Sequence, residues 1–249
     1  MQEERGIFEM VDLSKLTKWE MGKMFDYALL PKNTTEPEIR EGCRQAIAYN
    51  CMAFCYSSSY WTPVVAEELK GSDLLIGAAI AFPFGQQSSA VKVFETQEAV
   101  KMGATVLDNC MNVGNLKDKR YDEILHEFRE YKKAAGPAVT KMIIETCMLT
   151  KEEIEVACKL VAEAEIDWVK SSSGQYAGPS VQDVMLMVKA VAGSKTRVKV
   201  SGVKAPRPQN AYAFLLAGAE LIGTQGAPEI LDALDDMRAI GLVPQYTAG

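Results

Sequence analysis

The sequence predicts an α/β protein folded as a closed (β/α)8 barrel, the TIM barrel. Its 249 residues match the roughly 250 that such a barrel typically takes. Short apolar segments alternate with longer amphipathic ones, the order expected of parallel strands joined by helices. Eight apolar segments follow one another with no break that resembles a linker, which favours a closed barrel over an open doubly wound sheet.

The candidate strands are short and mostly aliphatic, and several lack polar alternation. This composition is expected when both faces of a parallel sheet are covered. The first strand has the weakest pattern. In chain order the predicted strands are Met24–Leu30, Met52–Tyr56, Leu74–Ala81, Thr105–Asn109, Val139–Glu145, Trp168–Ser171, Arg197–Ser201 and Glu220–Gly223.

Amphipathic segments between the strands carry helix start and stop signals. The segment from Glu36 follows Thr35, and the segment from Lys151 follows Thr150, and threonine is a favourable N-cap residue. Glycine follows the end of several segments, as is common after helices. The predicted helices are Glu36–Tyr49, Ala90–Met102, Asp118–Ala135, Lys151–Ala164, Val181–Val191 and Gln209–Ala217.

The pattern predicts one domain over residues 1–249, with a short helical extension at 1–22 and a tail at 240–249. The tail contains Tyr246, and two alternatives stay open for it. It folds over the mouth of the barrel, or it is a disordered end.

Composition excludes several classes of function. The net charge is −6 and no basic cluster is present, so nucleic-acid binding is not expected. The N-terminus has no signal-like apolar core, and no apolar run approaches the roughly 18 residues of a membrane span. We therefore expect a cytoplasmic protein without a membrane partner.

The cysteines and the single histidine limit the chemistry further. No Cys-x-x-Cys pair occurs, so a zinc site is not expected, and reduced thiols in a cytoplasmic enzyme fit best. His126 lies in a predicted helix with no nucleophile-elbow sequence, so acid and base functions fall to Lys, Asp, Glu or Tyr. The six cysteines are Cys43, Cys51, Cys55, Cys110, Cys147 and Cys158.

Two lysines at the ends of apolar runs are the main functional signal. Lys170 precedes a Ser-Ser-Ser-Gly turn, and Lys199 precedes Val-Ser-Gly. Burial and mutual repulsion both lower an ammonium pKa, which favours a neutral, nucleophilic amine near pH 7. The pair therefore suggests an imine-forming lysine with a cationic neighbour. The alternative is that each lysine is the solvated end of a strand.

Further side chains belong to the same edge if the barrel is correct, because catalysis in this fold lies at the C-terminal ends of strands. Asp108 ends a mostly apolar strand and is a candidate for proton transfer, with a loop or helix cap as the alternative. Asp26, Cys55 and Glu145 occupy comparable positions.

Serine- and glycine-rich turns follow the last three predicted strands. Loops at these positions often bind phosphate through backbone N–H groups, although glycine also simply permits tight turns. The turns are Lys170–Gly174, Ser201–Lys204 and Gly223–Gly226.

From about Phe25 to Gly226, the chain resembles the deoxyribose-phosphate aldolase family of class I aldolases. Its two lysine segments occur in the order that this family shows. The segments that carry the resemblance are Phe82-Pro-Phe-Gly85, Val91-Lys-Val-Phe-Glu95, Ile143-Ile-Glu-Thr-Cys-Met-Leu-Thr150, Trp168-Val-Lys-Ser-Ser-Ser-Gly174 and Val198-Lys-Val-Ser-Gly202.

The resemblance implies a TIM barrel that reversibly cleaves 2-deoxyribose 5-phosphate to acetaldehyde and glyceraldehyde 3-phosphate, with no metal and no cofactor. It implies that Lys170 forms the Schiff base, that Lys199 keeps Lys170 deprotonated, and that Asp108 relays protons through a water. It places Asp26 and Cys55 near the substrate. It assigns phosphate and substrate contacts to Ser173, Gly174, Ser201, Gly202, Lys204, Gly223 and Thr224.

Several substrate-facing segments depart from the family pattern. The usual Asp-His-Thr of the first strand is Asp26-Tyr-Ala28, and the usual Cys-x-Asn-Pro is Cys55-Tyr-Ser-Ser58. The usual Ser-Gly-Gly-Ile-Arg is Ser201-Gly-Val-Lys-Ala205, where valine hinders close backbone approach and Lys204 supplies a charge.

The sequence thus predicts a Schiff-base aldolase that acts on a small aldehyde or sugar-phosphate. Two alternatives stay open: an aldolase of the same family with another sugar-phosphate or hydroxy-aldehyde substrate, and a non-catalytic barrel that binds sugar phosphates. Barrels of this kind often pair through outer helices, so a homodimer is one expectation.

Overall fold

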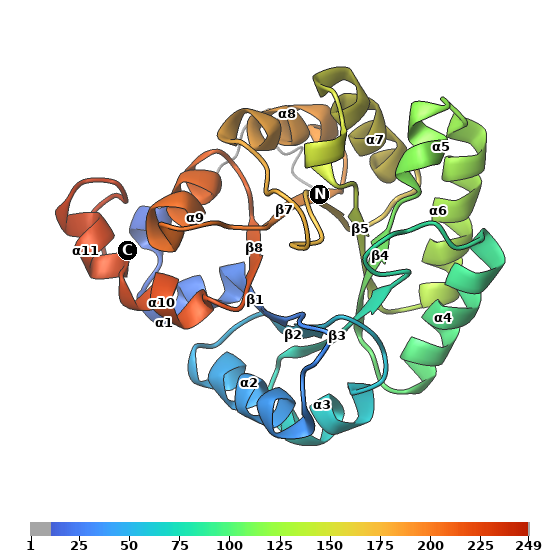
Figure 1. The fold of residues 1–249 in the computed structure, drawn as a ribbon. Helices are drawn as coiled ribbons and strands as arrows, with labels where there is room; N and C mark the ends of the chain where they lie inside the picture. Colours follow the sequence, from blue (N-terminus) through green and yellow to red (C-terminus); the bar gives the residue numbers. More distant parts are fainter. Residues whose placement is uncertain (1–10, 249) are drawn as a thin grey trace, which may run out of the picture.

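Eight apolar segments of the chain pair as parallel strands in sequence order, and the last pairs with the first (Figure 1). The computed structural model describes residues 11–248. The predicted closed barrel is confirmed, with every strand close to its predicted position. The strands are β1 (Phe25–Leu29), β2 (Ala53–Tyr56), β3 (Leu75–Ile80), β4 (Val106–Cys110), β5 (Val139–Ile143), β6 (Trp168–Lys170), β7 (Arg197–Ser201) and β8 (Leu221–Thr224).

Helices form the outer layer of the barrel (Figure 1). The predicted N-caps recur: the hydroxyl of Thr150 accepts a hydrogen bond from the Glu153 amide, and the Glu153 carboxylate accepts one from the Thr150 amide. The helices are α1 (Lys18–Met21), α2 (Glu36–Ala48), α3 (Thr62–Glu68), α4 (Ser89–Lys101), α5 (Val113–Lys117), α6 (Tyr121–Ala135), α7 (Lys151–Glu163), α8 (Val181–Val191), α9 (Arg207–Leu216), α10 (Ala227–Asp232) and α11 (Leu234–Ala239), with short 3-10 turns at Leu13–Lys15, Gly22–Met24 and Thr146–Met148.

One predicted helix is wrong in its first part. The sequence predicts a continuous helix over Asp118–Ala135, but α5 ends at Lys117 and α6 begins at Tyr121. Lys119 lies between them with φ +58°, a left-handed conformation that a helix cannot contain. The short helices α3, α10 and α11 were not predicted.

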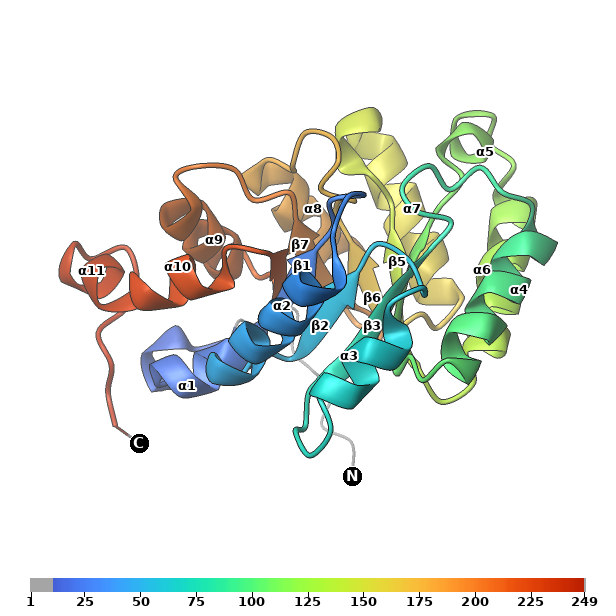
Figure 2. The same cartoon turned by 60° about the horizontal axis from the view of Figure 1, so that its bottom comes forward.

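The C-terminal tail lies away from the mouth. The amide of Thr247 donates to the carbonyl of Ser14 at 2.8 Å, and the Tyr246 ring lies 5.6 Å from the Arg238 guanidinium. Ser14 precedes β1, and the C-terminus lies at the end of the barrel where the strands begin (Figure 2). The tail therefore does not cover the mouth, which was one of its two expected positions.

Both faces of the barrel wall are buried. Apolar residues of the strands pack outward against the helices in two large clusters, while Ala28, Ala53, Cys55 and Val106 form a small cluster of their own. The wall thus leaves the inward positions at the strand ends for polar side chains.

Within residues 11–248, no helix combines the length and apolar character needed to cross a bilayer.

Candidate active site

Two lysines and an aspartate meet inside the barrel. Lys170 ends β6, and Lys199 on β7 lies in direct register with it. Asp108 Oδ2 on β4 lies 2.5 Å from Lys170 Nζ and 3.0 Å from Lys199 Nζ. All three residues are buried. The structure thus brings together the three side chains to which the sequence assigned the chemistry.

A second aspartate and a third lysine extend this cluster. Asp26 Oδ2 lies 2.6 Å from Lys199 Nζ and 2.5 Å from Lys141 Nζ. Asp26 is fully buried, and its Oδ2 atom is held between the two lysines. Sequence reasoning missed Lys141 because it took Glu145 as the functional polar group of this strand. The available signal was a lysine in the middle of Val139–Ile143.

Gly223 makes room for Lys199. A Cβ atom at this position of β8 would lie 2.4 Å from Ser201 Oγ and 2.9 Å from Lys199 Cε, both closer than atoms can pack. The sequence assigned Gly223 to a phosphate loop. The structure also gives it a packing function inside the barrel, where its missing side chain lets the lysine fit.

Burial sets the state of Lys170. Loss of solvent lowers the pKa of the Lys170 ammonium below its usual value; Asp108 acts against this shift, and the charge of Lys199 adds to it. The net direction is downward, which favours the neutral amine. A lysine amine is a nucleophile for carbonyl carbon only in its neutral form, so this direction of the pKa shift is the one that imine chemistry requires.

Lys199 shifts in the opposite direction. Burial opposes its charge, but Asp108 and Asp26 outweigh burial and raise the pKa of Lys199 well above its usual value. Burial likewise raises the pKa of Asp108, but Lys170 and Lys199 outweigh it, so the pKa of Asp108 lies well below its usual range. Lys199 therefore stays an ammonium and Asp108 a carboxylate near neutral pH.

Cys55 lies inside the barrel on β2, next to β3. A Cβ atom at Gly77 would lie 2.6 Å from its Sγ atom, so this glycine leaves space for the thiol. Burial raises the pKa of Cys55 to about 12. A thiol in this state is a weak nucleophile at neutral pH, so Cys55 serves as an apolar part of the barrel interior.

Glu145 links the loops that follow β5 and β6. Its backbone adopts a left-handed conformation with φ +56°. Its carboxylate accepts a hydrogen bond from the Ser173 amide, whose nitrogen lies 3.1 Å from Oε1 and 3.3 Å from Oε2. Ser173 is fully buried, and its hydroxyl accepts from the Gln175 amide at 3.2 Å. The loop after Lys170 is therefore held by Glu145, where the sequence had assigned Ser173 to substrate binding.

The loops after β6 and β7 touch through their backbones. A Cβ atom at Gly178 would lie 2.2 Å from the carbonyl oxygen of Gly202, which itself has φ +78°. Sequence reasoning missed Gly178. A hydrogen bond also links the starts of the two loops, because the amide of Ser201 donates to Ser171 Oγ at 3.1 Å. Gly174, with φ +87°, lies earlier in the first of these loops.

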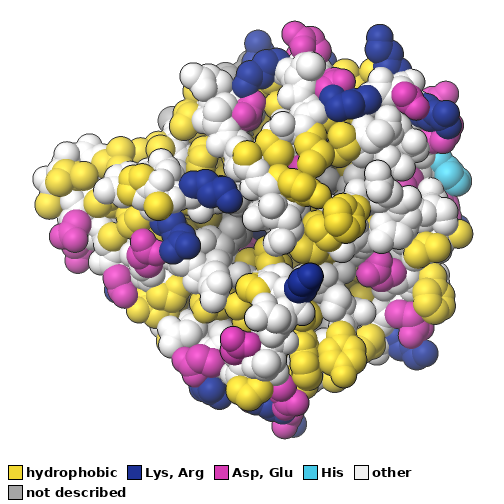
Figure 3. All heavy atoms as spheres, viewed as in Figure 1, with side chains coloured by type: hydrophobic (Ala, Val, Ile, Leu, Met, Phe, Trp, Pro, Cys, Tyr) yellow, Lys and Arg dark blue, Asp and Glu magenta, His cyan; other side chains and the backbone are white. Residues whose placement is uncertain are grey.

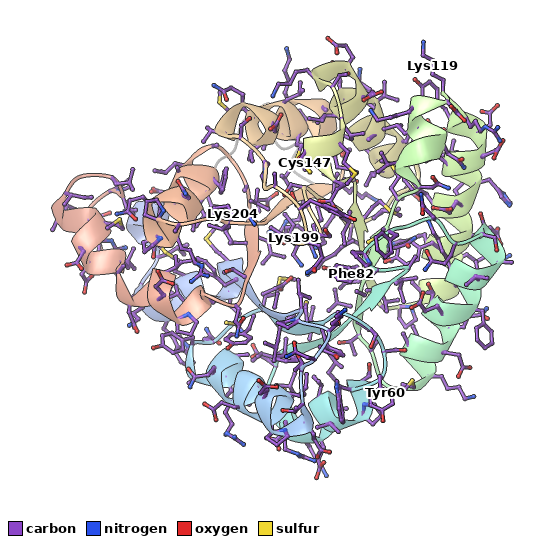
Figure 4. All side chains as sticks on the ribbon, viewed as in Figure 1. Tyr60, Phe82, Lys119, Cys147, Lys199 and Lys204 are labelled. Atoms are coloured by element: carbon purple, nitrogen blue, oxygen red, sulfur yellow. The ribbon has the colours of Figure 1, made fainter. Side chains whose placement is uncertain are left out.

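Two further predicted contacts lie nearer the surface. Lys204 is exposed, and it lies over the β7 side of the mouth, across from Phe82 (Figure 4). Thr224 is partly exposed, and its hydroxyl accepts a hydrogen bond from the Gly226 amide at 3.0 Å. Lys204 is thus placed to meet an anion that enters from the β7 side.

A cavity of about 230 Å³ lies at the mouth on the side of β3, β4 and β5. Figure 3 shows this face: it is hollowed near the barrel axis, and hydrophobic side chains gather beside the opening over β4 and β5. The cavity is lined mainly by apolar groups, among them Pro83, Phe84, Met111, Ile143, Met148 and Tyr176.

Over residues 11–248, no cluster of His, Cys, Asp and Glu is arranged to hold a metal ion.

Sequence comparison places this site among aldolases. A model of the DeoC/LacD aldolase family matches residues 17–210. A protein named deoxyribose-phosphate aldolase 1 from Mesoplasma florum is 39% identical over 213 residues, which cover 85% of this chain and 96% of that protein. A deoxyribose-phosphate aldolase from Streptococcus sanguinis shows the same identity and the same coverage of both chains.

Structural comparison agrees with the fold. A structure titled QR15, an aldolase, superposes with a TM-score of 0.81 at 29% identity and covers 89% of this chain and 99% of its own. A tetrameric deoxyribose phosphate aldolase from Aeropyrum pernix superposes with a TM-score of 0.81 at 23% identity, over 91% of this chain and 98% of that one. At that lower identity the likeness shows the barrel alone.

Proposed function

The chain belongs to the DeoC/LacD family of aldolases and is a lyase, and we propose that its substrate is 2-deoxyribose 5-phosphate, cleaved reversibly to acetaldehyde and glyceraldehyde 3-phosphate. The observation that carries the proposal is the buried Lys170 amine, whose pKa is lowered by burial, held 2.5 Å from a carboxylate. The names of the relatives supply the substrate.

Lys170 is the nucleophile of this reaction. Its neutral amine attacks the carbonyl carbon of the open-chain sugar, and loss of water gives an iminium. The positive nitrogen then accepts the electron pair of the breaking carbon–carbon bond, which leaves an enamine on Lys170 and releases the aldehyde product. Protonation of the enamine carbon and hydrolysis return the free lysine and acetaldehyde.

Asp108 transfers protons during the reaction, and the charge of Lys199 acts on Lys170. Asp108 binds both lysines through Oδ2, while its buried Oδ1 accepts no hydrogen bond from the described residues. Oδ1 is therefore the oxygen that takes a proton from a substrate hydroxyl through a water. Lys199 remains charged and disfavours a second ammonium at Lys170.

The β6–β8 side of the mouth receives the phosphate. The backbone contact between Gly178 and Gly202 holds two loops together there, and the exposed Lys204 supplies a positive charge. Val203 is buried, so its side chain packs inward rather than over the loop. This arrangement supports phosphate binding despite the missing second glycine of the family pattern.

Turnover of two sugars tests the substrate. We expect 2-deoxyribose 5-phosphate to be cleaved with a kcat/KM at least about a hundredfold above that of 2-deoxyribose, because the phosphate contacts add binding energy of roughly 3 kcal/mol. Acetaldehyde release is measured with a coupled dehydrogenase. Equal values for the two sugars would contradict phosphate recognition.

The cellular location and assembly belong to the same proposal. The cysteines of the described chain are free thiols, which supports a cytoplasmic location.

Exposed apolar side chains on α8, namely Val181 and Met185, support pairing of two copies through outer helices. Sedimentation velocity measures the assembly, and a monomer at micromolar concentration would contradict the dimer.

A further inference from the structure

Five charged side chains form a continuous chain of contacts inside the barrel. Asp26 Oδ2 lies 2.5 Å from Lys141 Nζ and 2.6 Å from Lys199 Nζ. Asp108 Oδ2 lies 3.0 Å from Lys199 Nζ and 2.5 Å from Lys170 Nζ. We call these five residues the lysine–aspartate cluster. Each of them exposes at most 4% of its surface, so little water is present to screen a net charge.

The lysine–aspartate cluster contains one lysine more than it has aspartates. A net charge that is out of contact with water is costly, so an electrically neutral cluster is favoured. Two ammonium groups balance the two carboxylates, and the third lysine is then an uncharged amine. The protonation of each lysine thus depends on the charges of the other four side chains.

Trp168 stabilises a charged Lys141. The buried indole lies in register with Lys141 on the neighbouring strand, and Lys141 Nζ lies 5.9 Å from the centroid of its ring. The face of an indole attracts a cation, and the attraction is stronger where water is excluded. Arg197 lies over the same ring at 4.1 Å, but Glu220 pairs with Arg197 at 2.7 Å and balances its charge.

Lys170 lies at the end of the cluster that is nearer the mouth. It is in register with Ile143, two residues beyond Lys141 on β5. Its Nζ donates to Asp108 Oδ2, which also accepts from Lys199. Burial lowers the pKa of Lys170, whereas two carboxylates outweigh burial and raise the pKa of Lys199. The uncharged lysine of the cluster is therefore Lys170.

Other titratable groups face the cluster without changing this balance. Cys55 faces it from β2 and Cys110 from β4, and burial raises the pKa of each thiol to about 12. Tyr131 of α6 donates to a carbonyl of β4, and burial raises the pKa of its phenol well above the usual value. Glu145 lies near Lys170 beyond the end of β5. It is retained in every variant below, so it does not account for differences between them.

We propose that Lys141 is a positioning residue of the aldolase reaction, which balances the charge of Asp26 and thereby leaves Lys170 as the one uncharged lysine of the cluster. The inference rests on the proposed imine chemistry at Lys170. Lys141 lies deeper in the barrel than Lys170, so it acts through Asp26 and Lys199 rather than on the substrate. Without Lys141, two lysines face two aspartates, and Lys170 takes up a proton from the solvent.

Lys141→Met tests this charge balance. Acetaldehyde is trapped with cyanoborohydride over a series of pH values, and the rate of ethylation is measured by intact mass after subtraction of a Lys170→Leu background. We expect the acidic limb of the trapping profile to move to higher pH by about one unit, because Lys170 becomes the second ammonium of a neutral cluster. A purely structural function would lower the yield of folded protein and leave the limb in place.

Asp26→Asn changes the balance in the opposite direction. It leaves three lysines with one carboxylate, so we expect the acidic limb to move to lower pH by about one unit. The double variant Lys141→Met/Asp26→Asn leaves two lysines with one carboxylate, which again makes one lysine uncharged. We expect its limb to return to that of the unmodified protein, whereas two packing defects would add rather than cancel.

A second buried pair supplies the matched control. Lys92→Met/Glu127→Leu removes a buried lysine and a buried carboxylate outside the cluster, and we expect its limb to stay in place. An unmoved limb in Lys141→Met, or a shift in the same direction in Asp26→Asn, overturns the function assigned to Lys141. If Lys141→Met does not fold, the double variant must have its limb at higher pH than Asp26→Asn, and equal limbs overturn the assignment.

These outcomes are separate from those that test the aldolase chemistry. Trapping at Lys170 in the unmodified protein, together with unmoved limbs in the variants, rejects this inference and leaves the proposed function intact. No trapping of acetaldehyde in the unmodified protein at any pH rejects both.

Discussion

The two lysines that contact Asp108 have opposite pKa shifts. Lys199 lies between two carboxylates, those of Asp26 and Asp108, at 2.6 and 3.0 Å, and its pKa rises. Lys170 has only Asp108, and burial dominates, so its pKa falls. The additional aspartate beside Lys199 therefore accounts for the opposite directions of the two pKa shifts.

Removing Lys199 tests this difference. Lys199→Met removes a positive charge near Lys170 and leaves Asp108 to pair with Lys170 alone, and both changes raise the pKa of Lys170. We expect the acidic limb of the kcat/KM profile to move to higher pH, and activity measured below the limb to fall about tenfold for each pH unit that the limb moves. Lys195→Met, at an exposed position, is the control. An unmoved limb would reject the electrostatic function of Lys199.

Asp108→Asn separates imine formation from proton transfer. The neutral amide no longer stabilises the Lys170 ammonium, so the pKa of Lys170 falls further and trapping by borohydride extends to lower pH. Turnover needs the carboxylate as a base, and we expect kcat to fall by about 10²- to 10⁴-fold. Trapped mass and kcat are measured on the same preparation. Retained turnover would show that another group moves the proton.

At this scale the sequence predicted which charged groups meet better than it predicted their surroundings. Lys170, Lys199 and Asp108 stood out because each is a charged group in or after an apolar run. Lys141 did not stand out, and neither the burial of Asp26 between two lysines nor the close packing at Gly223 was foreseen. The contacts of these three residues depend on which strands face one another in the closed barrel, and the order of residues in the sequence does not show which strands do so.

Among the larger elements, the paired loops after β6 and β7 form the proposed phosphate side. Gly178→Ala would place a Cβ atom 2.2 Å from the Gly202 carbonyl oxygen, so the loops must separate. We expect KM for 2-deoxyribose 5-phosphate to rise about tenfold, roughly 1.4 kcal/mol, with trapping of acetaldehyde retained. Ala48→Ser, which likewise adds one heavy atom but at an exposed position of α2, is the control. Equal KM values in both variants would remove these loops from phosphate binding.

A buried ion pair joins helices α4 and α6 behind the site. Lys92 Nζ lies 2.7 Å from Glu127 Oε1 and also donates to the carbonyl of Cys110 at the end of β4. Lys92→Met leaves the Glu127 carboxylate buried and unpaired, and we expect a loss of about 3–5 kcal/mol in the free energy of unfolding. Urea denaturation measures it. The double variant Lys92→Met/Glu127→Leu should recover most of the loss, and a further loss would contradict the assignment.

The elements themselves were largely predictable. Strands and long helices follow from apolar periodicity, and the N-cap at Thr150 follows from a local hydrogen-bonding pattern. The break at Lys119 and the short helices α3, α10 and α11 were not predicted. Segments this short contain too few turns for a period to be recognised, and their formation depends on packing against the barrel.

Barrel closure over the whole chain creates the site. Asp108 and Lys199 are 91 residues apart, and Asp26 and Lys141 are 115 apart, yet each pair is in hydrogen-bonding contact. Inward positions of β1, β4, β5, β6 and β7 supply the charges, and helices outside exclude water from them. The family's sequence pattern is therefore spread over most of the chain, and the fold brings its parts to one mouth.

Borohydride trapping with peptide mapping tests the central claim most directly. The unmodified protein is treated with acetaldehyde and borohydride, digested, and the ethylated lysine is located by mass spectrometry. The account predicts modification at Lys170, lost in Lys170→Leu and retained in the surface control Lys195→Met. Modification at Lys199 or Lys141 instead of Lys170, or undiminished labelling of the Lys170→Leu protein, would contradict it.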